Sequence, residues 1–143
     1  MTIAVDFDGT IVEDRYPEIG REIPFATQTL RMLIEQRHRI ILWSVREGEA
    51  LEAAVNWCRE RGVEFYAVNR DFPEENGTHQ TFSRKIKADV FIDDRNLCGI
   101  PDWGVIYRMI TEHVEYRDIV LEELGHADAG PPKRKKRKFS LFG

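Results

Sequence analysis

Thr2-Ile-Ala-Val-Asp-Phe-Asp-Gly-Thr10 is the stretch that decides the fold of this chain. It begins as an apolar, β-prone run and ends on two acids, Asp6 and Asp8, followed at once by glycine and threonine. Successive side chains of a strand point to opposite faces, so acids two positions apart lie on the same side where the strand ends. Neighbouring carboxylates repel one another unless a cation or a proton intervenes. The stretch therefore predicts a bound metal, a raised pKa, or both.

Three further apolar runs are short and β-rich, as expected of parallel strands buried on both faces, and they cover residues 39–43, 63–68 and 88–92. Helical apolar stripes follow Pro24 and Ala50, and the second is closed by Gly62 in a C-terminal cap position. Consecutive right-handed βαβ units predict an α/β fold: a doubly wound parallel sheet in three α/β/α layers, with the site at the carboxyl ends of the strands. A last helical segment, 103–124, is expected to be interrupted near residues 115–117.

The length of 143 residues fits a single domain, which we place at residues 1–128, followed by a basic tail at 129–143. Six of the 21 lysines and arginines lie in Lys133 to Lys138, whereas all 25 acids precede them. The body is therefore strongly acidic, and the tail is expected to be a disordered, solvated extension. No segment approaches the roughly 20 apolar residues of a transmembrane helix, and the two cysteines predict reduced thiols. We expect a cytoplasmic protein.

Polar side chains suited to phosphate or a metal follow the ends of three predicted strands. Asp6 and Asp8 follow the first strand and Ser44 and Arg46 the second, while Asp93 and Asp94 follow the fourth and Lys85 lies just before it. In a doubly wound fold these side chains converge in one crevice, with acids for a divalent cation and a hydroxyl plus cations for an anionic substrate. The third predicted strand, 63–68, offers no such residue.

Four motifs in this order, Asp-Phe-Asp-Gly-Thr, Leu-Trp-Ser, Lys85 and Ile-Asp-Asp, resemble those of the haloacid dehalogenase superfamily over residues 2–96. The resemblance implies a Mg²⁺-dependent phosphatase that acts through an aspartyl-phosphate intermediate. Receiver domains also combine clustered acids, a hydroxyl residue and a lysine. Their lysine comes last along the chain, however, so the hydrolase order fits better.

The resemblance assigns a role to each residue. Asp6 would attack phosphorus, and Asp8 would give a proton to the leaving oxygen and later take one from water. Ser44 would hydrogen-bond the transferring group, and Lys85, with Lys87 as its competitor, would neutralise the developing charge.

The same resemblance implies the metal and substrate contacts. Mg²⁺ would be held by a carboxylate oxygen of Asp6, the main-chain oxygen of Asp8 and the side chain of Asp94, with Asp93 as an auxiliary ligand. The phosphate would be contacted by residues of the first turn. For Arg46 we expect either an additional substrate contact or a surface ion pair. The turn residues are Phe7, Gly9 and Thr10.

The intervals between the motifs are too short for a cap domain, so the chain resembles the capless branch of the superfamily. An open site suits a large phosphorylated substrate, or a small one enclosed by a second subunit or by loops. The candidate walls are residues 13–23, which include Tyr16 as a possible contact, and residues 69–83. Two alternatives stay open: a polyanion-binding module that uses the basic tail beside a vestigial site, and phosphoryl transfer to an acceptor other than water.

Overall fold

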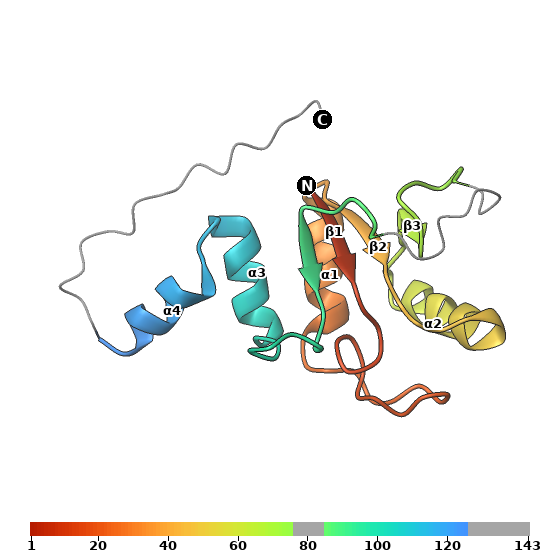
Figure 1. The fold of residues 1–143 in the computed structure, drawn as a ribbon, viewed down its shortest axis with the longest axis horizontal. Coiled ribbons are helices and arrows are strands. Elements are labelled where there is room, and N and C mark those ends of the chain that lie inside the picture. Colours follow the sequence, from red (N-terminus) through yellow and green to blue (C-terminus); the bar gives the residue numbers. More distant parts are fainter. Residues whose placement is uncertain (76–84, 126–143) are drawn as a thin grey trace. The chain divides into compact units, whose positions relative to one another are not determined.

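The computed structural model describes residues 1–75 and 85–125, and it has an α/β fold built on a parallel sheet (Figure 1). The strands are β1 (Thr2–Val5), β2 (Arg39–Leu42), β3 (Ala67–Val68) and β4 (Val90–Ile92), and the order across the sheet is β3-β2-β1-β4. All three neighbouring pairs are parallel. The helices are α1 (Ala26–Glu35), α2 (Gly48–Glu60), α3 (Trp103–Glu112) and α4 (Tyr116–Glu123).

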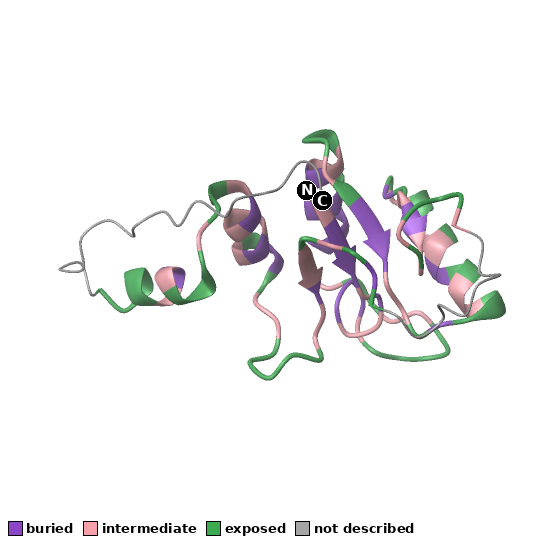
Figure 2. Ribbon diagram, turned by 45° about the horizontal axis from the view of Figure 1, so that its top comes forward, coloured by how far each residue is buried: buried purple, intermediate pink, exposed green. Residues whose placement is uncertain are grey.

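The central strands carry the core, as Figure 2 shows by the buried residues gathered on β1 and β2. Their apolar side chains, such as Ile3, Val5, Ile40 and Leu42, are at most 1% exposed because the strands are covered on both faces. Helix α1 contacts β2 through the side that holds the buried Leu30 and Leu33, and Figure 1 shows it alongside β1 and β2. The continuous apolar pattern of the sequence is thus explained by burial.

Helix α2 ends as predicted, on a glycine that adopts a left-handed conformation. Gly62 has φ 79° and donates its N–H to Arg59, while the Val63 N–H reaches back to Cys58 O at 3.0 Å. Val63 completes this cap and therefore does not pair with the neighbouring strand. The predicted strand 63–68 is reduced to the two residues of β3 at the edge of the sheet.

The loop after β1 folds back on itself. Val12 forms an antiparallel bridge with Glu22, and the Glu13 N–H donates to Arg21 O at 2.8 Å. Glu22 then accepts hydrogen bonds from the backbone and hydroxyl of Thr27, so it caps the start of α1. The predicted wall at residues 13–23 is consequently a short, internally bonded loop.

The described residues divide into two compact units, one before and one after the boundary between Trp103 and Gly104. The predicted helical segment 103–124 is confirmed, and its interruption lies at residues 113–115, slightly before the predicted 115–117, where His113 has φ 56°. Arg108 joins the two helices by pairing with Glu112 at 2.9 Å and with Glu122 at 2.7 Å.

The single domain at 1–128 stays a prediction, and the basic tail lies outside the described residues. No helix in the described ranges is long and apolar enough to span a membrane.

Candidate functional site

The site lies where the sheet changes its direction of winding. The chain passes from β1 to β2 to β3 on one side of the sheet, and β4 then returns to the other side of β1. In open α/β sheets such a switch point creates a crevice at the carboxyl ends of the strands. Val5 is paired with Ile92, and the Asp6 N–H donates to Ile92 O at 2.9 Å, so the acids that follow both strands are neighbours (Figure 1).

Three of the predicted acids form one cluster at this edge: Asp6, Asp93 and Asp94, called here the acid cluster. Each can offer a carboxylate oxygen such that all three oxygens lie within 4.8 Å of one another, and each residue is half-buried. The pKa of Asp6 is raised to about 7, mainly because burial disfavours the charged carboxylate. The negative charges of Asp93 and Asp94 add to the rise, while a hydrogen bond from the Phe7 backbone lowers the pKa in part. The metal-like ligand set and the raised pKa that we expected for Asp6 with Asp8 are instead found for Asp6 with Asp93 and Asp94.

Asp94 is held in this cluster by the turn after β1. Gly9 has φ 79°, and a Cβ atom there would overlap the Asp94 carboxylate, so both the backbone and the space require glycine. The Thr10 hydroxyl donates to Asp94 Oδ1 at 3.3 Å and accepts the Asp94 N–H at 3.1 Å. Trp103 Nε1 in turn donates to Thr10 O at 3.0 Å.

Thr10 therefore does not have the place that we predicted for it. Its side chain is 0% exposed, and both described bonds of its hydroxyl go to Asp94. The side chain orients an acid of the cluster and presents no surface to a substrate. The Phe7 side chain is also fully buried, with its ring edge against Trp57 at 5.8 Å between centroids. A phosphate contact by the Phe7 backbone stays a prediction.

Asp8 lies outside the acid cluster and is paired with an arginine. Arg46 Nε donates to Asp8 Oδ2 at 2.6 Å, and a terminal nitrogen donates to Oδ1 at 2.7 Å. The Asp8 side chain is 10% exposed, while that of Arg46 is 0% exposed. Hydrogen bonding to Asp8 raises the pKa of Arg46 further above its ordinary value, so the guanidinium stays charged.

The predicted substrate contact by Arg46 is not supported by this geometry. A side chain without exposed surface, whose guanidinium is engaged by Asp8, cannot meet a ligand from solvent. The sequence correctly placed Arg46 at the carboxyl edge, but it did not show that the side chain turns toward Asp8.

Ser44 is positioned by a residue that the sequence analysis missed. Asn69, directly after β3, has φ 52°, and its Oδ1 accepts the Ser44 N–H at 2.8 Å. Ser44 Oγ accepts the Arg46 N–H at 3.1 Å, so the β2–α2 turn is held at both ends. The signal was an asparagine at the end of an apolar run, since asparagine is among the few residues that adopt the left-handed conformation readily. All four strands are thus followed by a polar residue of the site.

Lys85 is placed apart from the acid cluster in the described part of the chain. Its Nζ lies 4.7 Å from the centre of the Phe91 ring, and the residue is exposed. With Lys87 and Asp89 it borders a pocket of about 440 Å³ near Thr2, which begins β1. The roles of Lys85 and of its competitor Lys87 stay predictions, and residues 76–84 before them lie outside the described ranges.

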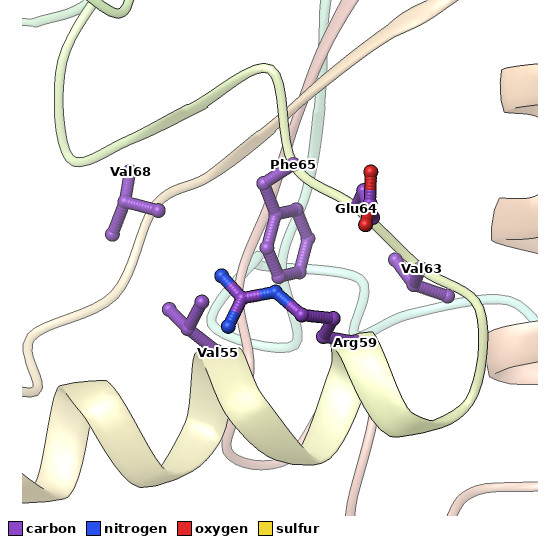
Figure 3. A pocket seen from close by; sticks show the side chains of 6 residues that line it. All are labelled: Val55, Arg59, Val63, Glu64, Phe65 and Val68. Atoms are coloured by element: carbon purple, nitrogen blue, oxygen red, sulfur yellow. The ribbon is translucent and has the colours of Figure 1, made fainter.

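A smaller pocket, of about 210 Å³, lies between α2 and the segment that leads into β3 (Figure 3). Figure 3 shows the Arg59 side chain extending toward Val55 and Phe65. The pocket is lined by Val55, Arg59, Val63, Glu64, Phe65 and Val68. It contains none of the predicted site residues and offers one carboxylate, from Glu64. The acid cluster with the Asp8–Arg46 pair is the better candidate site.

Fold and site together define an α/β protein with a carboxylate cluster at the switch point of a parallel sheet. No protein-family model matches the chain, and no curated protein matches it. A solved structure does: a conserved protein from Bacteroides thetaiotaomicron is 68% identical, with a TM-score of 0.78. The match covers 83% of this chain and 96% of that protein. The chain therefore belongs to the same family as this conserved Bacteroides protein.

Proposed function

We propose that this chain is a capless, Mg²⁺-dependent phosphomonoester hydrolase of the haloacid dehalogenase superfamily, with Asp6 as the residue that becomes phosphorylated. The observation that carries the proposal is the acid cluster, whose carboxylate oxygens lie within 4.8 Å of one another at the ends of β1 and β4. Structural roles rarely require three acids to share so small a volume, whereas a divalent cation does. The finer fold expected from this assignment is the doubly wound, three-layer core of that superfamily.

The donor set fits magnesium. Hard carboxylate oxygens are its preferred protein ligands, and the mutual repulsion of these acids, which helps to raise the pKa of Asp6, favours a bound cation. Asp6 and Asp94 would hold the ion with the main-chain oxygen of Asp8, and Asp93 would support them. When bound, Mg²⁺ would offset the repulsion between the Asp6 carboxylate and the phosphate and polarise the phosphoryl oxygens.

The reaction would proceed in two displacements. An Asp6 carboxylate oxygen forms a bond to phosphorus while the bond from phosphorus to the leaving oxygen breaks, and Asp8 gives a proton to that oxygen. Asp8 then takes a proton from water, whose oxygen attacks phosphorus and releases phosphate from Asp6. Ser44, fixed by Asn69, would hydrogen-bond the phosphoryl group. Lys85 lies at the amino end of the sheet, so offsetting the phosphoryl charge would require its side chain to move to the carboxyl end.

The absence of a cap is supported by the intervals between strands. Residues 6–38 hold the internally bonded loop and α1, while residues 44–75, the described part of the interval between Ser44 and Lys85, hold α2 and β3. Neither of these described stretches contains a further folded layer. A site bounded by loops alone suits a phosphate on a large molecule as well as on a small one.

The test is turnover of p-nitrophenyl phosphate with and without Mg²⁺ by the wild type, Asp6→Asn and Asp89→Asn. Asp89 is the matched control, because it is an exposed acid at the opposite end of β4, and an amide oxygen can still accept the Thr2 N–H there. We expect Asp6→Asn to lose at least about 10³-fold in kcat, since it removes the nucleophile. Asp89→Asn should retain the wild-type rate. Equal activity of the wild type and Asp6→Asn would refute the mechanism.

A further inference from the structure

Arg46 has every one of its hydrogen-bond donors occupied within the protein. Its Nε and one NH2 hydrogen go to the two oxygens of Asp8, and the other NH2 hydrogen goes to Glu18 O at 2.8 Å. The two NH1 hydrogens go to Pro17 O at 2.9 Å and to Ala50 O at 3.2 Å. A guanidinium has five N–H donors, and these five bonds use them all. The group has no donor left for a ligand.

Two aromatic rings complete this enclosure. The Arg46 Cζ lies 5.1 Å from the centre of the Phe7 ring and 5.2 Å from that of Tyr16. Phe7 is buried, whereas Tyr16 is 59% exposed and so forms the solvent side of the arrangement. Such ring contacts stabilise a guanidinium and restrict its orientation. Arg46 is thus held by three segments of the chain: the first turn, the loop at residues 16–18, and the start of α2.

We propose that Arg46 is a positioning residue, which sets the orientation of the Asp8 carboxylate for proton transfer and couples that orientation to the loop at residues 16–18. The proposal rests on the proposed function, because it concerns the proton donor of that reaction. It adds a residue that acts through Asp8 and touches no substrate.

The physical reason is the geometry of the pair. Two parallel N–H···O bonds fix the plane of a carboxylate as well as its position, which a point charge cannot do. Proton transfer requires the donor oxygen within about 3 Å of the leaving oxygen, so a small rotation of Asp8 would remove its contribution. The carbonyls of Pro17 and Glu18 meet the same guanidinium, so a shift of that loop changes the support of Asp8.

Arg46→Lys tests this idea, because it keeps the positive charge and removes the two parallel N–H donors that hold Asp8. The measurement is the first turnover of two esters with Mg²⁺: p-nitrophenyl phosphate, whose leaving group departs without a proton, and 2-phenylethyl phosphate, whose alkoxide needs one. We expect Arg46→Lys to slow the alkyl ester about 100-fold, at the lower limit of what general acid catalysis contributes. The first release of nitrophenolate should change little. Arg61→Lys is the matched control, since Arg61 also stacks on an aromatic ring but away from Asp8. Its Cζ lies 3.7 Å from the centre of the Trp57 ring.

A merely structural role would give a different pattern. Equal losses on both esters, or no loss on either, would overturn the proposal. If Arg46→Lys does not fold, Arg46→Lys combined with Asp8→Asn replaces it, compared with Asp8→Asn alone. We expect equal alkyl ester rates from these two proteins, because the residue that Arg46 positions is already absent. A further loss in the double variant would contradict the proposal. Failure of the proposed function is distinguishable, since the wild type would then show no Mg²⁺-dependent turnover.

Discussion

The two ends of the same sheet treat their charged residues differently. At the amino ends, Lys85, Lys87 and Asp89 are exposed around a pocket of about 440 Å³. At the carboxyl ends, Asp6, Asp93 and Asp94 are half-buried, and Thr10 and Gly9 shape the space around Asp94. Burying like charges together costs free energy, and proteins keep such arrangements mainly at functional sites. In this protein, the burial of like charges at the carboxyl ends therefore marks the candidate site better than pocket volume does.

Lys85→Met tests the contrast between the two ends of the sheet and has the largest expected effect. If the proposed chemistry is correct, Lys85→Met should lower kcat on p-nitrophenyl phosphate by about 10²- to 10³-fold, as removal of a group that stabilises transition-state charge does. The control is Lys87→Met, two positions away and equally exposed, which should retain the wild-type rate. Steady-state rates of both variants decide between the two lysines. A loss in Lys87→Met alone would transfer the role to Lys87, and no loss in either would leave both at the amino end as ordinary surface charges.

At the carboxyl end of the sheet, the residue to test is Thr10, which orients Asp94. Thr10→Val keeps the shape of the side chain and removes its two described hydrogen bonds to Asp94. Groups that orient a metal ligand typically contribute 10- to 100-fold in affinity, so we expect Mg²⁺ binding by isothermal titration calorimetry to weaken by about that factor. Thr2→Val is the matched control, because it lies at the start of β1, where Asp89 accepts its backbone N–H and not its hydroxyl. Unchanged affinity in Thr10→Val would mean that Asp94 is not a ligand.

The sequence was sufficient to predict the parts of the site that follow from strand geometry. Apolar runs with acids at their ends, in a right-handed parallel topology, place Asp6 beside Asp93 without further information. The conserved protein from Bacteroides thetaiotaomicron shows the family and its fold, and the acids were located by the pattern alone.

The partners of the acids were not predictable in the same way. Arg46 meets carbonyls of Pro17, Glu18 and Ala50, and a backbone carbonyl has no sequence signature. Thr10 was assigned to the substrate because it belongs to the first motif, whereas its burial and its hydrogen bonds to Asp94 show a different place for the side chain. Side-chain direction within a turn depends on tertiary packing, which a linear pattern does not contain.

The last expected effect concerns the pH dependence of stability of the metal-free protein. Asp6 has a pKa of about 7 when folded and about 3.8 in the ordinary state, so the folded protein binds an extra proton between these values. Its free energy of unfolding should therefore fall as pH rises from 4 to 7, by at most about 1.4 kcal/mol per pH unit and by less where solvent screens the charges. Above pH 7 this contribution should be constant.

Urea unfolding at several pH values, in EDTA, measures this effect as the difference between the wild type and Asp6→Asn. We expect that difference to grow in favour of Asp6→Asn up to pH 7, while Asp89→Asn should follow the wild type throughout. Saturating Mg²⁺ should remove the difference or invert it, because the ion binds the ionised carboxylate and competes with the proton. A wild type that tracks Asp6→Asn across the whole range would show that the acid cluster carries no electrostatic cost, and the contrast between the two ends of the sheet would then have no functional meaning.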